Sequence, residues 1–235
     1  MKRTIRERLR VAEHVNKALA AGEAVTALES TVIAHGLPPP LNIETAQACE
    51  EVIRNCGATP ATIGIVEGVP TIGLSERELE LFARRSDGTP IKKVSLNNLA
   101  AVMQSRGWGA TTVAASLRIA RAGGLSVFST GGIGGVHRGA AESFDVSADL
   151  TALANTPIVC ICAGAKAILD LHKTVELLET LGVPVIGYRT EEFPAFYLRS
   201  SGNPVSARVD TPDEAAALLH VHWTLHGAGV VLAQP

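Results

Sequence analysis

The sequence predicts an α/β protein of three layers, in which a mostly parallel sheet is covered by helices on both faces. Short apolar runs alternate with windows of helical periodicity along most of the chain, which is the order typical of parallel sheets with crossover helices. Runs such as "ATIGIV" and "PIVCIC" are largely apolar, as expected for strands buried on both faces. The chain has no repeat, low-complexity tract or linker, so residues 1–235 are predicted to form a single domain.

The first half of the chain supplies three predicted strands, residues 24–28, 61–66 and 125–130. Its predicted helices are residues 1–22, 42–57, 76–85, 99–106 and 112–122. Asn42 is expected to cap the second of these helices and Gly57 to end it. Ser75 followed by Glu78 forms a capping-box pattern before the third.

The second half continues the alternation. Its predicted strands are residues 157–162, 183–188 and 229–233, and residues 167–182 form a predicted helix that ends at Gly182. Thr211, Pro212 and Glu214 fit the cap, first and third positions of a last helix. The second half therefore repeats the strand and helix pattern of a parallel sheet.

Composition excludes several classes of function. The chain is 46% hydrophobic and 19% charged, as in ordinary globular proteins. A net charge of -2 gives no basic surface for a nucleic-acid polymer. The N-terminal stretch lacks the apolar core of a signal peptide, and no run is long enough to span a membrane. Four cysteines without metal-ligand spacing are expected to be free thiols, which favours a cytoplasmic location.

A glycine-rich stretch after the strand at residues 125–130 is the densest candidate site. "STGGIGGVHRGAAESFDVSADL" places four glycines before His137 and Arg138. Exposed backbone amides beside a cation suit a phosphate group. The spacing does not match the G-x-G-x-x-G fingerprint of dinucleotide-binding proteins. A purely structural turn is the alternative, although it would not account for the charged residues that follow.

The same stretch holds a candidate metal site. Asp145, Ser147 and Asp149 alternate along the chain, and their oxygen atoms are suitable ligands for a hard divalent ion that keeps most of its waters. Alternatively, Ser147 and Asp149 cap a helix over residues 148–155. The spacing leaves both interpretations open.

Lys166 is predicted to lie where the strand at residues 157–162 leads into the following helix. Such junctions border the ligand crevice in α/β proteins. The positive end of a helix dipole would lower the pKa of this amine, and a partly neutral amine is what Schiff-base chemistry needs. The alternative is a lysine that reaches solvent or holds an anion.

Glu29 ends the strand at residues 24–28 and is predicted to lie at the same crevice. A partly buried carboxyl group there can stay protonated and act as a general acid. The alternative is a glutamate that accepts hydrogen bonds from the Ser30 or Thr31 amide. Lys93 and the small-residue stretch "GATTVAAS" add weaker candidate contacts for a ligand.

The chain closely resembles the pseudouridine-5'-phosphate glycosidase family from about the first strand to its last residues. The stretches that carry the resemblance are "ALESTVIAHGLPPP", "GATTVAAS", "FSTGGIGGVHRG", "FDVSADL", "CAGAKAILDL", "GVPVIGYRTEEFPAFY" and "SGNPVSARVD". The resemblance implies an α/β/α fold and reversible cleavage of pseudouridine 5'-phosphate into uracil and ribose 5-phosphate. It also implies a manganese-dependent homotrimer.

The resemblance assigns a role to each matching residue. Lys166 corresponds to the nucleophile that forms a Schiff base, and Glu29 to the proton donor. The position of Asp145 is that of the metal ligand. The implied substrate contacts are Lys93, Val113, Ser147, Ala148 and Asp149. From the residues themselves, we add His137 or Arg138 as the partner of the 5'-phosphate.

Two features differ from the family pattern. Residues 96–98 read "LNN", where the family usually has an Arg-Asp pair. The family also continues beyond the position of Pro235 into a helical segment, so we expect an exposed apolar face or an open cleft and weaker assembly. A weakly active or inactive phosphosugar-binding homologue is therefore the alternative function. A sugar kinase or dinucleotide enzyme is a further alternative, but the chain has no P-loop.

Overall fold

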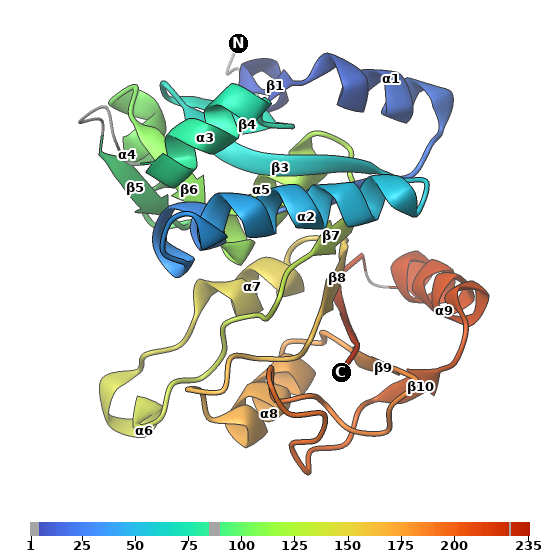
Figure 1. The fold of residues 1–235 in the computed structure, drawn as a ribbon. Coiled ribbons are helices and arrows are strands. Elements are labelled where there is room, and N and C mark those ends of the chain that lie inside the picture. The colour runs from blue at the N-terminus through green and yellow to red at the C-terminus, as the bar shows by residue number, and fades with distance from the viewer. Residues whose placement is uncertain (1–4, 85–89, 226) are drawn as a thin grey trace. The chain divides into compact units, whose positions relative to one another are not determined.

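The computed structural model describes residues 5–84, 90–225 and 227–235 (Figure 1). Contacts divide the chain into two compact units, Met1–Leu125 and Ser126–Pro235, here called unit 1 and unit 2. Strands paired mostly in parallel alternate with helices in both units, so the predicted α/β fold class is confirmed. The prediction that the chain forms a single domain stays a prediction.

The sheet of unit 1 is built around β3 (Thr59–Val66), whose last seven residues are all buried. The antiparallel strand β4 (Val69–Ile72) follows one edge of β3, and β1 (Arg10–Val11) extends that side in parallel. The parallel strand β2 (Val25–Leu28) pairs with the first half of β3. The antiparallel strand β6 (Trp108–Thr111) pairs with the second half, and β5 (Ile91–Val94) lies parallel to β6.

Helices cover the sheet of unit 1. They are the 3-10 helix η1 (Ile5–Arg8), α1 (Glu13–Ala21), the π-helix η2 (Val32–Gly36), α2 (Leu41–Asn55), α3 (Glu76–Arg84), α4 (Leu99–Gln104) and α5 (Val113–Ala122). In Figure 1, α2 lies in front of β3 and α5 behind it, and both contact the strand. Layers of helix, sheet and helix are the arrangement predicted from the sequence.

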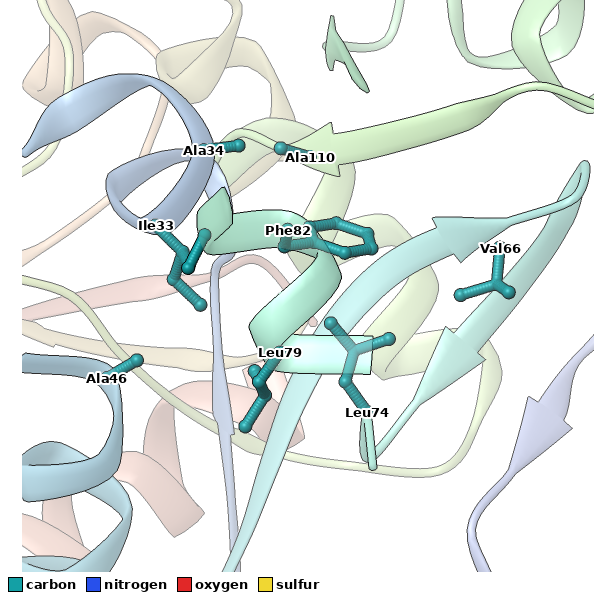
Figure 2. Packing of buried hydrophobic residues seen from close by; sticks show 9 residues of the cluster. Ile33, Ala34, Ala46, Val66, Leu74, Leu79, Phe82 and Ala110 are labelled. Carbon is teal, nitrogen blue, oxygen red and sulfur yellow. The ribbon is translucent and has the colours of Figure 1, made fainter. Parts of the chain in front are cut away.

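Figure 2 shows the apolar core beneath α3, where the Phe82 ring lies among Ile33, Leu74 and Leu79. Gly64 of β3 faces this ring, since a Cβ atom at Gly64 would lie 2.8 Å from Phe82 Cζ. The absence of a side chain at Gly64 therefore lets α3 approach β3 closely. Phe82 is fully buried.

The sheet of unit 2 runs in the order β7 (Val127–Ser129), β8 (Val159–Cys162), β11 (Val230–Ala233), β9 (Val185–Tyr188) and β10 (Ala207–Val209). Every pairing among these strands is parallel. Its helices are α6 (Ala140–Ser143), α7 (Ala148–Ala154), α8 (Leu171–Thr180) and α9 (Pro212–Leu225). In Figure 1, α7 and α8 lie on one side of β8 and α9 lies on the other.

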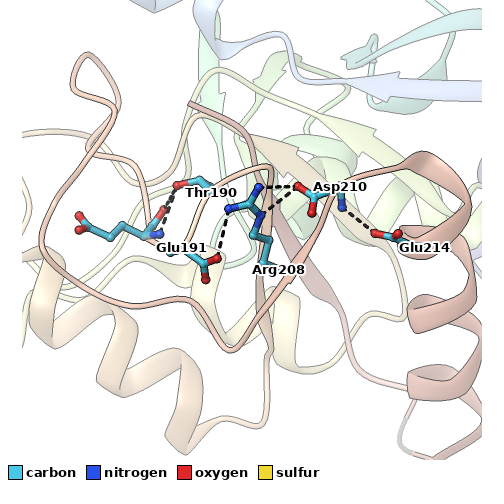
Figure 3. A network of polar contacts seen from close by, with 6 residues as sticks. Thr190, Glu191, Arg208, Asp210 and Glu214 are labelled. Carbon is cyan, nitrogen blue, oxygen red and sulfur yellow. Dashed lines mark hydrogen bonds and ion pairs between the residues drawn. The ribbon is translucent and has the colours of Figure 1, made fainter.

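Beyond β10, charged residues hold the chain as it enters α9 (Figure 3). Arg208 donates to Asp210 Oδ1 over 2.8 Å and to Glu191 Oε1 over 3.2 Å. The Asp210 and Glu191 carboxylates raise the pKa of Arg208. The Asp210 amide in turn donates to Glu214 Oε2 in the first turn of α9 over 2.7 Å, so β10 and α9 are tied through side chains.

Two predicted helix starts are confirmed. The Ser75 amide donates to Glu78 Oε2 over 2.8 Å, and the Glu78 amide donates to Ser75 Oγ over 3.3 Å, which is the reciprocal capping box. At the start of α9, the Glu214 amide donates to Thr211 Oγ1 over 3.2 Å. Both starts were readable because the cap and its partner lie three residues apart.

Three predicted helix starts are wrong. Residues 5–11 form η1 and β1, because β1 gains a parallel partner in β4, and α1 begins only at Glu13. Asn42 lies inside α2 and donates to the carbonyl oxygens of Ile33 and Ala83, both over 2.9 Å. After β8, residues 163–170 are irregular, and α8 begins at Leu171 with Asp170 as its cap.

Candidate active site

In unit 1, the carboxyl ends of three strands meet beside Ile63 of β3. The last pair between β2 and β3 is Leu28 with Thr62, and Ala110 of β6 pairs with Gly64. Because β2 is parallel and β6 antiparallel to β3, the two strands end facing each other at Ile63. Val94, the last residue of β5, pairs with Thr111, the last residue of β6. Residues that follow these strands are therefore brought to one place.

Three of the predicted site residues lie at this meeting point. Glu29 directly follows β2 and is partly buried. Lys93 is an exposed residue of β5, and Val113 is the first residue of α5, directly after β6 and Thr112. Val113 is 1% exposed, so its side chain is packed inside unit 1.

Two buried hydroxyl groups in the same place have no hydrogen-bond partner among the residues that the structure describes. Thr31 Oγ1 and Thr112 Oγ1 are buried and make no hydrogen bond to any described residue. Buried polar groups are normally hydrogen-bonded, and exceptions call for a ligand, a water molecule or another explanation. Thr31 follows Glu29 by two residues and Thr112 directly precedes Val113, as expected for a ligand site at the strand ends of unit 1.

In unit 2, the predicted glycine-rich stretch forms a loop over residues 131–137, here called the glycine loop. On one side it bonds to the Lys166 segment, because the Lys166 amide donates to the Ile133 carbonyl oxygen over 3.1 Å. On the other side, the His137 amide donates to the Asp145 carbonyl oxygen over 3.0 Å. The loop therefore links the predicted nucleophile to the predicted metal and substrate residues.

Most backbone amides near the middle of the glycine loop already have acceptors within the protein. The Gly134 amide donates to Asp149 Oδ2 over 2.8 Å, and the Val136 amide donates to Thr174 Oγ1 over 3.0 Å. The Ile133 amide also has a backbone acceptor, the Gly164 carbonyl oxygen at 3.0 Å. The Gly134 amide is therefore not a free phosphate donor, and phosphate binding by the other glycine amides stays a prediction. The side chains of His137 and Arg138 remain as predicted phosphate partners.

Close packing explains why this loop needs glycine. A Cβ atom at Gly134 would lie 2.2 Å from Ser147 Oγ, and one at Gly135 would lie 2.3 Å from Thr174 Oγ1. Both positions therefore exclude a side chain. The glycines bring the backbone within hydrogen-bonding distance of Asp149 and Thr174, which is a structural role for residues that the sequence suggested as a phosphate cradle.

Lys166 lies in the irregular segment between β8 and α8, and its side chain is exposed. Since α8 begins only at Leu171, the predicted influence of a helix N-terminus on this amine has no structural basis. The cap residue Asp170 accepts from the Lys173 amide over 3.1 Å and pairs with the Lys173 ammonium group. Lys173 lowers the pKa of Asp170 by hydrogen bonding. The hydrogen bonds that hold Lys166 within the described part of the chain come from its backbone.

The Ser147 side chain caps α7, as one of the two sequence interpretations predicted. The Asp149 amide donates to Ser147 Oγ over 3.2 Å. Asp149 itself is 6% exposed and holds the glycine loop through Gly134, while Ala148 is partly buried at the start of α7. Ser147 and Asp149 therefore already form hydrogen bonds within the protein. Their predicted substrate contacts would be made in addition to these bonds.

Asp145 offers limited means of holding a metal ion. Its carboxylate is exposed, and Asp145 Oδ2 lies 3.7 Å from His137 Nδ1. Among the residues described, no group of three or more His, Cys, Asp or Glu side chains could hold a metal ion. One carboxylate with one imidazole fits an ion that keeps most of its water ligands. The sequence prediction used the oxygens of Asp145, Ser147 and Asp149 instead, and the metal site stays a prediction.

Sequence reasoning missed Thr174 of α8, which is fully buried and accepts from the glycine loop. It also missed Ser30, Thr111 and Ser116, which are fully buried in unit 1. A single hydroxyl in an apolar strand or helix carries no spacing signal. The one local signal was the run of small residues at 109–116, which includes Val113.

Strands that alternate with helices, Glu29 directly after β2 and the exposed Lys166 after β8 are the features of an α/β enzyme. The chain belongs to the family of indigoidine synthase A like proteins, whose model matches residues 14–235. The predicted resemblance to pseudouridine-5'-phosphate glycosidases is confirmed by relatives with that name. Within the described residues, no helix is long and apolar enough to cross a membrane.

The named relatives match almost the whole chain. The pseudouridine-5'-phosphate glycosidase of Roseiflexus sp. is 55% identical over 225 residues, which are 96% of this chain and 72% of the relative. That of Caldanaerobacter subterraneus subsp. tengcongensis is 53% identical over 226 residues, or 96% of this chain and 73% of the relative. The chain thus spans nearly three quarters of these relatives.

Two solved structures share the fold. The prealnumycin C-glycosynthase AlnA, in complex with ribulose 5-phosphate, matches with a TM-score of 0.89 and 40% identity over 97% of this chain and 73% of its own. An indigoidine synthase A like protein from Thermotoga maritima matches with a TM-score of 0.88 and 33% identity over 100% of this chain and 76% of its own.

Proposed function

We propose that this chain is a pseudouridine-5'-phosphate glycosidase, which reversibly cleaves pseudouridine 5'-phosphate into uracil and ribose 5-phosphate through a Schiff base on Lys166. The observation that carries the proposal is the placement of Lys166, an exposed amine whose backbone is fixed to the glycine loop beside His137 and Arg138. Relatives that are more than half identical carry this name.

The bond to be cleaved explains the need for an amine. Pseudouridine joins C1' of ribose to a carbon of uracil, so protonating a glycosidic oxygen, the usual step in glycoside hydrolysis, is not available. An amine at C1' provides an electron sink, because its lone pair can form a carbon–nitrogen double bond as the carbon–carbon bond breaks. Lysine is the side chain suited to this chemistry.

Lys166 Nζ attacks C1', and the ring oxygen leaves with a proton from Glu29, which opens the ribose ring. The nitrogen lone pair then forms the iminium as the C1'–uracil bond breaks. The electrons of that bond go to the uracil carbon, which takes up a proton. Water hydrolyses the iminium, releases ribose 5-phosphate and restores the lysine. The net reaction consumes one water molecule, and the same steps in reverse form the nucleotide.

The remaining residues are assigned to binding. Arg138 and His137 hold the 5'-phosphate, and Arg138 has an exposed guanidinium that reaches the Ala167 carbonyl oxygen over 3.4 Å. Val113, the first residue of α5, is a further proposed substrate contact. The further substrate contacts are Lys93, Ser147, Ala148 and Asp149. A remote phosphate anchor positions C1' against the amine and lowers the entropic cost of the reaction.

We also propose manganese as the cofactor, with Asp145 as the residue that would hold it. Bound Mn2+ supplies positive charge and ordered water ligands. The assembly proposed for this chain is a homotrimer in the cytoplasm, and the family resemblance is the support for it. Small phosphorylated sugars and uracil are the proposed partners, without nucleic-acid polymers or membranes.

The proposal is tested by the reverse reaction. Purified protein is incubated with uracil, ribose 5-phosphate and Mn2+, and the products are analysed by mass spectrometry. We expect the mass of pseudouridine 5'-phosphate, and we expect none when ribose replaces ribose 5-phosphate. Parallel samples with Mg2+ or with a chelator measure the metal requirement. Absence of product at every metal concentration would contradict the proposal and leave a phosphosugar-binding homologue.

A further inference from the structure

A chain of three buried hydroxyl groups fills the place in unit 1 where β2 and β6 end. Ser30, Thr111 and Ser116 are all fully buried. Ser116 Oγ donates to Thr111 Oγ1 over 2.9 Å, and Thr111 Oγ1 donates to the Ile63 carbonyl oxygen over 2.7 Å. Ser30 Oγ donates to the same carbonyl oxygen over 2.6 Å. These three residues are here called the hydroxyl network.

The topology of the sheet explains why hydroxyl groups are needed here. Ile63 lies between the pairs that β3 makes with β2 and those it makes with β6. Its carbonyl oxygen therefore takes hydrogen bonds from two side chains. A buried carbonyl without any partner costs about 1–3 kcal/mol. The hydroxyl network supplies these partners and closes the gap between the two strand ends.

The network also joins the two strand ends directly. The Ser30 amide donates to the Thr111 carbonyl oxygen over 3.3 Å, and the Thr111 amide donates to Ser30 Oγ over 3.0 Å. Each residue thus gives a backbone amide to the other. Glu29 precedes Ser30 in the chain, and Val113 follows Thr111 by two residues. A shift of Ser30 against Thr111 would therefore move Glu29 relative to the start of α5.

We infer that the hydroxyl network positions Glu29 for proton donation, an inference that rests on the proposed function. Ser30, Thr111 and Ser116 are fully buried, so they cannot touch the substrate themselves. They are positioning residues that act through Glu29. Each hydroxyl hydrogen of the network is donated to the Ile63 carbonyl oxygen or to Thr111 Oγ1, so the proton donor next to the network is Glu29. A displacement of about 1 Å in a catalytic group can cost roughly a hundredfold in rate.

The test compares two buried threonines of unit 1. Thr111→Val removes the centre of the network at nearly constant volume. Thr71→Val is the matched control, since Thr71 is 1% exposed in β4 and its hydroxyl donates to the Val69 carbonyl oxygen, outside the hydroxyl network, over 3.1 Å. We expect Thr111→Val to lower kcat roughly 10–100-fold with little change in KM. Thr71→Val should match the wild type, and Thr111→Ser should restore most of kcat.

A double-mutant cycle separates positioning from general damage. If the network acts through Glu29, Thr111→Val should have little further effect on the residual turnover of Glu29→Gln. Where circular dichroism shows that Thr111→Val does not fold, Ser116→Ala takes its place. That variant removes the end of the network and should lower kcat in the same direction by a smaller factor.

The outcomes are distinct. Wild-type protein without turnover overturns the proposed function and with it the role of Glu29. Wild-type turnover with equal kcat for Thr111→Val and Thr71→Val overturns only the inference. Additive effects of Thr111→Val and Glu29→Gln also overturn it, because they would show that the network acts independently of the proton donor.

Discussion

The backbone amide of Lys166 donates to the carbonyl oxygen of Ile133 over 3.1 Å, so the proposed nucleophile is fixed to the glycine loop. No regular helix or strand holds it, since β8 ends at Cys162 and α8 begins at Leu171. The position of the amine therefore depends on the shape of the glycine loop. Its chemistry and its support can be tested separately.

Lys166→Arg should abolish turnover, because arginine keeps the positive charge but cannot form an imine. Borohydride reduction of wild-type protein with ribose 5-phosphate should add one sugar-phosphate mass to the peptide that contains Lys166. Peptide mass spectrometry measures the adduct, and Lys166→Ala should lose both adduct and turnover.

Lys173→Arg is the matched control for the trapping experiment. Lys173 is an exposed lysine of the same unit, and its ammonium group pairs with Asp170. This variant should retain the adduct on Lys166. Substantial turnover by Lys166→Arg, or an adduct found on Lys93, would contradict the assignment of the nucleophile.

Thr174→Val should loosen the glycine loop and destabilise unit 2. Thr174 Oγ1 accepts from the Val136 amide over 3.0 Å and donates to the Asp170 carbonyl oxygen over 2.7 Å, and the residue is fully buried. Valine would leave the Val136 amide without a partner, which costs about 1–3 kcal/mol. Urea unfolding measures the loss, and Thr174→Ser should recover much of it.

The last residue of α8, Thr180, is the control for Thr174. Thr180 is exposed on α8, and its hydroxyl makes the same kind of bond, to the Glu176 carbonyl oxygen over 2.9 Å. Thr180→Val should change the free energy of unfolding by less than about 0.5 kcal/mol. Equal losses for the two valine variants would show that the contact with the glycine loop adds nothing to stability.

The sequence predicted the elements that carry strong local signals. The strand at 183–188 was found as β9, and the helix at 112–122 as α5, which begins at Val113. The capping box of Ser75 and Glu78 was also found, because both partners lie within one turn.

Elements that depend on distant partners were missed. β1 is two residues long and exists through its pairing with β4, and the antiparallel pairing of β6 with β3 leaves no local pattern. The start of α8 at Leu171, four residues later than predicted, also depends on a distant partner. The Lys166 amide bonds to the glycine loop instead of starting a helix. Tertiary hydrogen bonds thus decide the backbone at the site, although its residues were named from the sequence alone.

Glu78 should make the stability of unit 1 depend on acid pH. Burial raises the pKa of this carboxyl. Hydrogen bonds from the Ser75 amide, from Arg10 and from the Ser75 hydroxyl lower the pKa by more than burial raises it, so the pKa lies below its ordinary value of 4.5. A lowered carboxyl pKa adds stability that is complete above the ordinary value and is lost as the pH falls through the folded-state pKa.

The measurement compares Glu78→Gln with the wild type by urea unfolding at several pH values. The wild type should be more stable at neutral pH, and its advantage should shrink as the pH falls below 4.5. Glu76→Gln is the control, because Glu76 is exposed in the same helix turn. A constant difference between Glu78→Gln and wild type across this pH range would contradict the prediction.

Asn98→Asp should weaken the turn that follows Lys93, although it restores the acidic residue that the family resemblance places in this region. Asn98 Oδ1 accepts from the Ser95 amide over 2.9 Å, and Asn98 Nδ2 donates to the Lys93 carbonyl oxygen over 3.0 Å. Aspartate can keep the first bond but has no hydrogen for the second, so an oxygen would face the Lys93 carbonyl.

We expect Asn98→Asp to lose about 1 kcal/mol of stability and to raise KM for pseudouridine 5'-phosphate, because Lys93 is a proposed substrate contact on the same turn. Asn97→Asp introduces the same charge on the exposed neighbouring residue and should change neither quantity by much. Unfolding in urea and steady-state kinetics provide the two measurements. If both variants behave alike, charge alone explains the effect. An unchanged KM with lowered stability would mean that the turn supports the fold without setting the position of Lys93.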